Sequence, residues 1–258
     1  MALIINNDPL AESKDRWAKD FPPTGGSDYW NIIDSNVKQW AKDVTIAPFW
    51  SEAGKELEKW RTEYRAETGS TLLSQASLPD FVPKSVGSSI DKLDRKFSKS
   101  EDSNHAFTSG YPIPNIGDLI RVRLTCSYLD GVEFVAKKIM DLATLMDINA
   151  VHERQGKIEG YYAQHINISQ DVILKVGGVP SVIKVECEIQ IATDMSTKMW
   201  NTSHGLYERI RSAPSDAENW QWRSTDPRFI SNQLGHMVHL VDGLLIQLRD
   251  SVKSKGRK

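Results

Sequence analysis

The sequence predicts an α+β fold: a mixed or largely antiparallel sheet of about five strands, flanked by helices. Two segments, 120–126 ("IRVRLTC") and 185–193 ("VECEIQIAT"), alternate between apolar and polar residues, as a strand with one buried face does. Apolar residues at helical spacing dominate the first quarter of the chain and the part after residue 194. Strands grouped between helices in this way are typical of the α+β class.

The N-terminal part, residues 1–79, is expected to be helical. Ser27 or Asp28 is a suitable N-cap for a first helix, and a second helix containing Trp60 ends near Gly69. We interpret both helices as additions to a core that follows them in the sequence.

Residues 80–211 form the predicted core. Besides the two alternating strands, it contains an amphipathic helix over 130–148 and a further helix over 194–211. The segments 159–168 ("EGYYAQHINI") and 171–176 ("DVILKV") are expected to pair as a hairpin. Residues 212–258 then supply one long helix and a basic tail. Because no linker divides the chain, 1–258 is predicted to be a single domain.

Composition narrows the class of protein. The chain has 258 residues, 26% of them charged, and a net charge of -2, which argues against a generally basic nucleic-acid coat. Its two cysteines, Cys126 and Cys187, are too few for a zinc site and favour a reducing compartment. Neither a bilayer-spanning apolar run nor a signal peptide is evident, so a cytoplasmic protein without a membrane partner is expected.

The polar faces of the predicted strands carry the chemistry. A sheet face that meets only solvent has mixed polar residues, whereas these strands gather carboxylates, guanidinium groups and an aromatic ring. Carboxylates hold Mg²⁺ together with substrate phosphates, arginines bind phosphate, and a tyrosine is a platform for a base. The residues concerned are Asp118, Arg121, Arg123, Tyr161, His165, Glu186, Glu188 and Gln190.

Four segments in order resemble the synthetase domain of the RelA/SpoT family, which makes the alarmones ppGpp and pppGpp in the stringent response. "KSVGSSIDKL" (84–93) is similar to the lysine-serine stretch before the family's first strand, and "IGDLIRVRLTC" (116–126) to its aspartate strand. "GYYAQH" (160–165) resembles its Gly-Tyr-x-Ser-x-His loop, and "EIQIAT" (188–193) its Glu-x-Gln-x-Arg-Thr strand. The resemblance covers about residues 80–211 and implies a nucleotidyltransferase-like fold.

The resemblance also implies an activity. An ATP-dependent pyrophosphokinase of this family, with Mg²⁺ as cofactor, moves the β,γ-diphosphate of ATP to the ribose 3′-hydroxyl of an acceptor. Asp118 and Glu188 would be the metal ligands and the catalytic pair, with Glu188 also taking the proton of the hydroxyl. The implied ATP-binding residues are Lys84, Ser88, Lys92 and Arg123, and the implied acceptor-binding residues are Tyr161, His165, Gln190 and His204.

Three positions depart from the family pattern. Val82, Ala163 and Ala192 stand where the family has arginine, serine and arginine. The Tyr-Tyr-Ala-x-His sequence resembles the toxic small alarmone synthetases, several of which modify the 3′ CCA end of tRNA. The acceptor therefore remains open between GDP or GTP, an adenine nucleotide and tRNA, and an antitoxin protein is a further expected partner. The alternative is a degenerate nucleotide- or partner-binding module without catalysis.

Several further aromatic and histidine residues have expected positions outside this set. Trp200 is expected in the core under the sheet, whereas Trp220 and Trp222 either form a lid or a partner surface or fold back on the core. His236 and His239 have a spacing that suits a metal, although no acidic or thiol partner is evident. None of the six histidines is followed by aspartate, so the His-Asp hydrolase site of the long family members is not expected.

Overall fold

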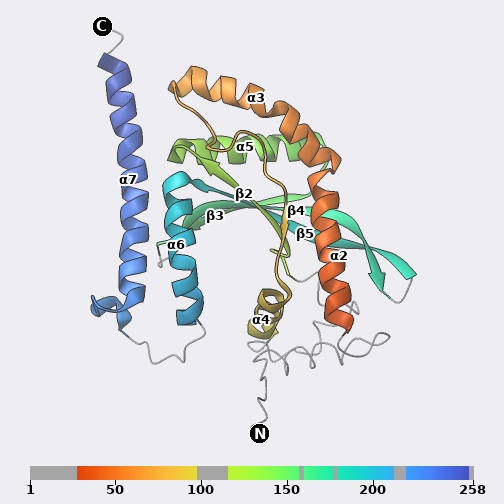
Figure 1. Cartoon of the computed structure of the whole chain (residues 1–258). Helices are drawn as coiled ribbons and strands as arrows, with labels where there is room; N and C mark the ends of the chain where they lie inside the picture. Colours follow the sequence, from red (N-terminus) through yellow and green to blue (C-terminus); the bar gives the residue numbers. More distant parts are fainter. Residues whose placement is uncertain (1–27, 98–115, 157–159, 177–178, 212–218, 256–258) are drawn as a thin grey trace. The chain divides into compact units, whose positions relative to one another are not determined.

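The computed structural model describes residues 28–97, 116–156, 160–176, 179–211 and 219–255 (Figure 1). Six helices and one short 3-10 helix lie in these ranges, together with five strands. The α-helices are α2 (Asp28–Thr45), α3 (Pro48–Thr68), α4 (Val86–Phe97), α5 (Leu129–Leu145), α6 (Asp194–Arg211) and α7 (Pro227–Lys255), and the 3-10 helix is η3 (Trp220–Trp222).

The five strands form one sheet in the order β1-β2-β5-β4-β3. β5 therefore lies between β2 and β4, which brings together the two alternating segments of the sequence. The α+β fold with about five strands is confirmed. The strands are β1 (Val82–Pro83), β2 (Ile120–Cys126), β3 (Ala150–Gly156), β4 (Tyr162–Val176) and β5 (Val179–Thr193).

Two of the predicted strands are one. The segments 159–168 and 171–176 were expected to form a hairpin, but residues 162–176 form the continuous strand β4. Polar residues between them suggested a turn, but Asp171 is simply an exposed residue of a strand whose alternation continues through it. The edge strand β3 was not predicted, because its sequence AVHERQG is polar and it buries no residue fully.

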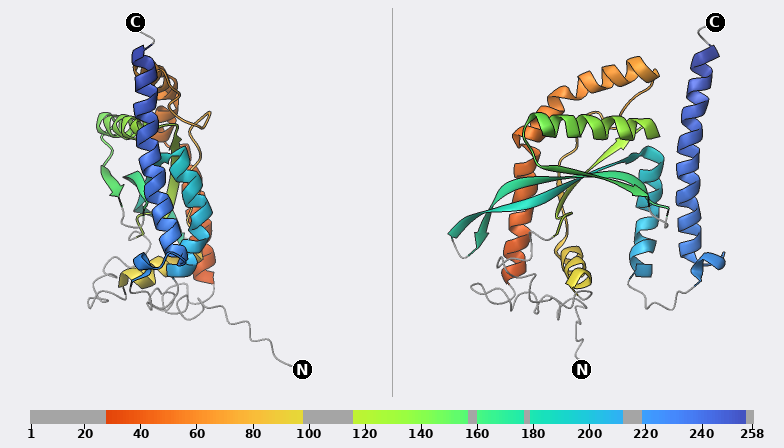
Figure 2. Two further views of the ribbon diagram at one scale, coloured as in Figure 1. Left: turned by 90° about the vertical axis from the view of Figure 1, so that its left-hand side faces the viewer. Right: turned by 180° about the vertical axis from the view of Figure 1, so that it is seen from behind.

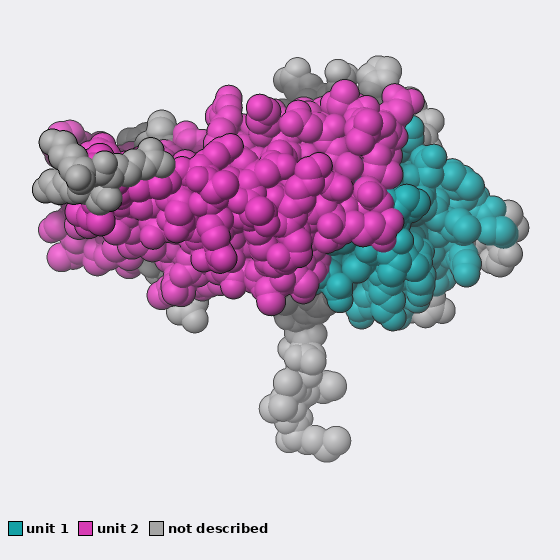
Figure 3. All heavy atoms as spheres, turned by 90° about the horizontal axis from the view of Figure 1, so that it is seen from above, with its two compact units in different colours: residues 1–50, 80–122, 167–188 teal, residues 51–79, 123–166, 189–258 magenta. Residues whose placement is uncertain are grey.

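The described residues divide into two compact units, coloured separately in Figure 3. Unit 1 consists of residues 1–50, 80–122 and 167–188, and unit 2 of residues 51–79, 123–166 and 189–258. Strands β2, β4 and β5 each run from one unit into the other. The prediction of a single domain over 1–258 stays a prediction.

Unit 1 packs α2 against β1 and the distal part of β4. Trp40 is 1% exposed, and its indole N–H donates to the carbonyl of Ile173 at 2.7 Å. Phe81, next to β1, meets the ring of Trp50 edge-on at 4.9 Å between centroids. These aromatic contacts fix the chain that leads directly into Lys84.

In unit 2, a cluster of polar side chains connects three helices. Tyr64 on α3 donates its hydroxyl proton to Asp130 at 2.7 Å, and Arg249 on α7 binds the other carboxylate oxygen at 2.7 Å. Burial opposes ionisation of Asp130, but the hydrogen bonds from Arg249 and Tyr64 outweigh it and lower the pKa of that carboxyl. The cluster joins α3, α5 and α7.

None of the helices in the described ranges combines the length and the apolar character that a membrane crossing requires. Cys126 and Cys187 are both buried free thiols, and burial raises the pKa of Cys187 to about 12. They act as core residues of β2 and β5.

Candidate functional site

In unit 1 the candidate site begins where β1 ends. The backbone N–H of Lys84 donates to the carbonyl of Leu119 at 2.8 Å, which extends the β1–β2 pairing by one bond. Ser85 caps α4, because its Oγ accepts the N–H of Ser88 at 3.2 Å. Ser88 and Lys92, four apart on α4, share one face of that helix. The short strand β1 and the capped helix α4 thus determine the positions of Lys84 and Lys92.

The two lysines converge on Asp118. Lys84 Nζ lies 2.6 Å from Oδ2 and Lys92 Nζ lies 2.7 Å from Oδ1, so each carboxylate oxygen has one ammonium partner. Burial of the carboxyl tends to raise its pKa, but the charge and hydrogen bond of Lys84, followed by those of Lys92, hold the pKa of Asp118 at about 2. Asp118 is therefore ionised at any physiological pH.

Strand β5 adds one carboxylate near Asp118. A Cβ placed on Gly117 would meet Oε2 of Glu186 at 2.8 Å, so Glu186 reaches the residue next to Asp118. Glu188 follows two residues later on the same face of β5. Glu186 is exposed, and its carboxylate is directed toward the Gly117–Asp118 segment.

This donor set fits Mg²⁺. Magnesium is bound through one or two carboxylates, with waters and substrate phosphates completing its octahedron. Asp118, Glu186 and Glu188 provide hard oxygen donors on unit 1. No three acidic, imidazole or thiol side chains of the described residues are arranged to hold a metal by themselves, so phosphate oxygens would have to complete the coordination.

In unit 2 a cluster of rings surrounds the start of β4. The Tyr161 hydroxyl lies 3.0 Å from Nε2 of His165, and the two rings are edge-on. Trp200 on α6 meets the Tyr161 ring at 4.7 Å between centroids, with 54° between the planes. Trp200 was expected in the core, but it is half-buried and contacts Tyr161. Its place on α6 could not be related to β4 from the sequence.

Arg123 on β2 is oriented by two amides of unit 2. Its Nε and Nη2 both donate to Oε1 of Gln190, at 3.2 and 2.8 Å, and Nη1 donates to Oδ1 of Asn201 at 3.1 Å. Gln190 is 8% exposed, so the guanidinium of Arg123 is held by a buried side chain. Asn201 was not singled out in the sequence, because an exposed polar residue on a helix has no distinguishing pattern.

The neighbouring Tyr162 contacts α7. Its ring stacks on His239 at 3.7 Å, nearly parallel, and its hydroxyl lies 2.9 Å from Nδ1 of His236. Both histidines therefore contact Tyr162. Alternation along β4 puts Tyr162 on the face of Ile166, opposite Tyr161.

Gly160 fixes the position of both tyrosines. It has a φ of 76°, in the left-handed region, and a Cβ there would lie 2.5 Å from the carbonyl oxygen of Asn232. A Cβ on Gly235 of α7 would lie 2.2 Å from the carbonyl oxygen of Gly160. Two glycines thus let the backbone before β4 touch the backbone of α7, which no side chain would permit.

The structure places the three residues that depart from the family pattern: Val82, Ala163 and Ala192. Ala163 and Ala192 are 7% and 5% exposed, and alternation puts them on the faces of β4 and β5 that carry Tyr161 and Gln190. Strand β5 consequently lacks a cation at position 192. Val82 is half exposed on β1. His204 lies on α6, and its side chain is outside the described part of the structure.

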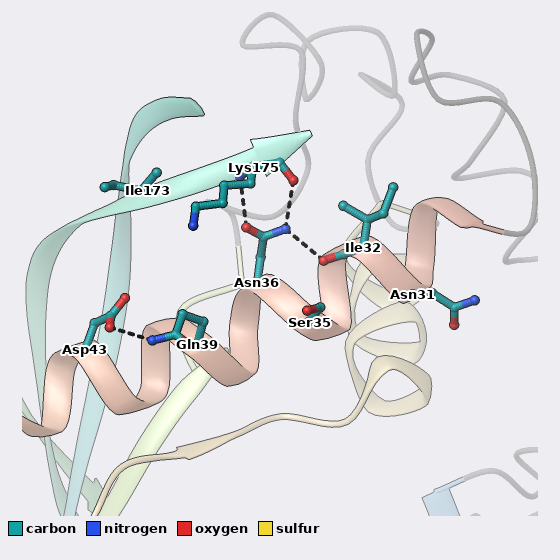
Figure 4. A pocket seen from close by; sticks show the side chains of 8 residues that line it. All are labelled: Asn31, Ile32, Ser35, Asn36, Gln39, Asp43, Ile173 and Lys175. Carbon is teal, nitrogen blue, oxygen red and sulfur yellow. Dashed lines mark hydrogen bonds between the residues drawn. The ribbon is translucent and has the colours of Figure 1, made fainter. Parts of the chain in front are cut away.

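A separate polar groove lies in unit 1 along α2 (Figure 4). Asn36 dominates it: its amide accepts the N–H of Lys175 at 2.9 Å and donates to the Lys175 carbonyl at 3.1 Å. The side chain thereby pairs with β4 as a neighbouring strand would. None of the predicted site residues lines this groove, and its amides serve the sheet.

No protein-family model matches the sequence, and no curated protein sequence does. Solved structures do match. Small alarmone synthetase 1 from Bacillus subtilis bound to its product pppGpp aligns with a TM-score of 0.57 at 17% identity, covering 88% of this chain and 99% of that chain. The fold is that of the small alarmone synthetases.

Two further structures agree with this fold. The same Bacillus subtilis synthetase bound to AMPCPP aligns with a TM-score of 0.51 at 18% identity, over 88% of this chain and 100% of that chain. A GTP pyrophosphokinase family protein from Streptococcus pneumoniae aligns with a TM-score of 0.51 at 15% identity, over 89% and 97%. The alarmone-synthetase fold therefore spans nearly the whole chain, beyond the 80–211 segment that carries the sequence motifs.

Proposed function

We propose that this protein is an ATP-dependent pyrophosphokinase. The observation that carries the proposal is Asp118, kept ionised between Lys84 and Lys92 beside the carboxylates of β5. The fold adds support, because structures with this fold have been solved with the ATP analogue AMPCPP and with the product pppGpp. A charged cluster of this composition suits a triphosphate and its metal.

Unit 1 is proposed to bind the donor. Phosphate oxygens of ATP compete with Asp118 for the ammonium groups of Lys84 and Lys92. When these ammonium groups turn to the phosphates, the Asp118 oxygens become available to bind a metal. Asp118 and Glu188 are the proposed ligands of Mg²⁺, which neutralises phosphate charge when bound. Ser88, on the same face of α4 as Lys92, is the proposed hydrogen-bond donor to a phosphate.

The chemical step is a displacement at phosphorus. The 3′-hydroxyl oxygen of the acceptor forms a bond to the β-phosphorus of ATP, and the bond from that phosphorus to the α–β bridging oxygen breaks, so AMP leaves. The proposed role of Glu188 is to accept the hydroxyl proton. Little covalent assistance is needed, because positioning and charge neutralisation dominate this chemistry.

Unit 2 is proposed to supply the rings. Tyr161, braced by Trp200, stacks on the acceptor base, and His165 lies near the acceptor phosphates. Arg123, held by Gln190 and Asn201, stacks on the adenine of ATP. The proposed acceptors are GDP or GTP, in keeping with the pppGpp-bound structure, and the terminal adenosine of tRNA.

Ala192 favours the tRNA end as a second candidate. With alanine at position 192, this part of β5 offers no cation to the multiple 5′-phosphates of a guanine nucleotide. The terminal nucleotide of tRNA carries a single phosphodiester there, and the rest of an RNA gains affinity through phosphate contacts elsewhere.

One experiment tests the proposal. The protein is incubated with Mg²⁺ and ATP labelled at the γ-phosphate, and separately with GDP, GTP, ATP and bulk tRNA, before the products are resolved. Labelled pppGpp or ppGpp supports alarmone synthesis, and labelled tRNA supports the toxin activity and the expectation of an antitoxin partner. The absence of labelled product with every acceptor, from folded protein, contradicts the pyrophosphokinase proposal and supports a non-catalytic binding module.

A further inference from the structure

Helix α7 buries an acidic side chain that has no place in the proposed reaction. Asp242 is 3% exposed and lies near the middle of α7, where that helix runs beside α6 (Figures 1 and 2). Burial raises the pKa of its carboxyl, against the hydrogen bonds from Thr193 and Ser196 that lower it. Burying a carboxylate costs free energy that an apolar side chain would avoid, so this residue points to a specific task.

Asp242 acts on the residue that joins β5 to α6. Thr193, the last residue of β5, is 2% exposed and donates its hydroxyl proton to Oδ2 of Asp242 at 2.5 Å. The same hydroxyl oxygen accepts the backbone N–H of Ser196 at 3.0 Å, so Thr193 is the N-cap of α6. A hydroxyl has one proton, and donating it to Asp242 leaves the oxygen lone pairs for Ser196. The carboxylate therefore fixes the orientation of the cap.

Two segments that hold Arg123 diverge from Thr193. Gln190 lies three residues before Thr193 on β5, and Asn201 lies eight residues after it on α6. The Arg123 guanidinium donates hydrogen bonds to the side-chain amides of both residues. Its orientation therefore depends on the angle between the strand and the helix, and that angle is set at the cap.

The length of α6 amplifies any change in this angle. At 1.5 Å per residue, Asn201 lies about 12 Å along the helix from Thr193, so a tilt of about 5° moves its amide by about 1 Å. The hydrogen bond from Arg123 to Asn201 is 3.1 Å long, near the upper end of the usual range, so a shift of this size breaks it. A small rearrangement at the cap thus reaches the guanidinium.

We propose that Asp242 is a positioning residue for Arg123, acting through the Thr193 cap and α6. The inference rests on the proposed function, in which Arg123 stacks on the adenine of ATP. With the cap locked, the guanidinium is held on two sides before ATP arrives, and little freedom is lost on binding. Without Asp242 the helix tilts on its strand, the contact with Asn201 is lost, and ATP binds more weakly.

Arginine side-chain NMR tests the positioning without any nucleotide. Rotation of the Arg123 guanidinium about its Nε–Cζ bond is slow when Gln190 and Asn201 hold its two ends, and it is measured on the full chain labelled with nitrogen-15 arginine. The signal is assigned by its loss in Arg123→Lys. Asp242→Leu keeps the side-chain volume and removes the acceptor, so rotation should become about tenfold faster, the scale of one lost hydrogen bond. Unchanged slow rotation in folded Asp242→Leu would overturn the proposal.

Three further variants separate positioning from general stability. Asp242→Asn keeps an oxygen acceptor for the Thr193 hydroxyl and should retain the slow rotation. Thr193→Val removes that hydroxyl and should reproduce the effect of Asp242→Leu, which also provides the test if the leucine variant does not fold. The matched control is Asp250→Leu, because Asp250 lies on the same helix with its side chain 57% exposed. Fast rotation in this control would mean that any change in α7 loosens Arg123, and it would refute a specific role for Asp242.

Calorimetric titration of ATP then connects the positioning to binding. Asp242→Leu and Asn201→Ala should each raise the Kd for ATP about tenfold, and the double variant should be no worse than either, because both act on one hydrogen bond. Additive losses would refute the route through α6. Faster rotation with an unchanged Kd would support the positioning of Arg123 and contradict its proposed contact with adenine. If the wild-type chain binds no ATP, the proposed function fails and the rotation rate alone decides this inference.

Discussion

The two candidate clusters, one in each unit, differ in the forces that organise them. In unit 1, Lys84, Lys92 and Asp118 are arranged by charge, with ion pairs of 2.6 and 2.7 Å in a half-buried setting. In unit 2, Tyr161 and Trp200 are arranged by ring contact and by the fit of Gly160 against α7. Charge recognises phosphates and flat rings recognise bases, so the difference suggests a division between donor phosphates and acceptor base.

The largest expected effect comes from the proposed proton acceptor. Glu188→Gln removes a negative charge and a base without changing side-chain volume, and should lower turnover about 10²–10⁴-fold. The measurement is the initial rate of label transfer from ATP, together with the melting temperature. Glu153→Gln, on the exposed edge strand β3, is the matched control and should retain full activity. Undiminished transfer by folded Glu188→Gln would refute the role of Glu188.

Gly160→Ala should disturb unit 2 alone. A methyl group there lies 2.5 Å from the Asn232 carbonyl oxygen, and a left-handed φ adds strain of about 1–3 kcal/mol. The expected results are a lower melting temperature and a higher acceptor KM. Gly54→Ala, with no neighbour within 4 Å in helix α3, should instead stabilise by up to about 1 kcal/mol. Equal melting temperatures of the two variants would contradict the close contact between Gly160 and α7.

Lys84→Ala should weaken the donor side. Loss of one charged hydrogen bond to a phosphate is expected to cost about 1–3 kcal/mol of ATP binding, measured by calorimetric titration. Lys92→Ala should cost less, since the Lys92 side chain is 35% exposed and that of Lys84 is 11% exposed. Lys38→Ala removes only an exposed pair with Asp34 and serves as the control. Unchanged ATP affinity in Lys84→Ala would exclude this lysine from the donor site.

Tyr161→Ala should have the converse effect. Loss of a stacked base is expected to cost about 1–3 kcal/mol, seen as a higher acceptor KM with an unchanged Kd for ATP. Tyr161→Phe keeps the ring and should keep most of the affinity. If both variants weaken ATP binding and leave the acceptor KM unaltered, the proposed division between the two units is wrong.

The smallest expected effect is the loss of local stability at acidic pH. Burial, with a contribution from His236, lowers the pKa of His239 despite the opposing charge of Asp242. Because its pKa is lowered, His239 stabilises the folded state at pH values above its ordinary pKa of 6.5. That stability is lost as the pH falls below 6.5 toward the lowered pKa of the folded state. Asp118, with a pKa of about 2, loses its contribution only as pH falls below its ordinary value of 3.8. On acidification to pH 5.5, amide hydrogen exchange should therefore show that α7 loses protection before α4. If α4 loses protection first, these pKa directions for His239 and Asp118 are wrong.

The sequence alone predicted most of the elements. Clean alternation marked β2 and β5, and helical periodicity marked α5 and α6, because these patterns arise from which face is buried. The polar edge strand β3 buries no residue fully and was missed, and the continuous β4 was divided at its exposed polar residues. Order and spacing of four short motifs also predicted the fold that the solved structures share.

Contacts between elements distant in the chain were decided by the tertiary structure. The sequence identified Lys84, Lys92 and Asp118 one by one, but only the folded chain shows both ammonium groups on one carboxylate. Trp200 contacts Tyr161 and Asn201 contacts Arg123 because α6 packs beside β4 and β2. His239 stacks on Tyr162. Local pattern encodes which face of an element is buried, whereas which side chains meet across elements depends on packing distances that no short sequence window contains.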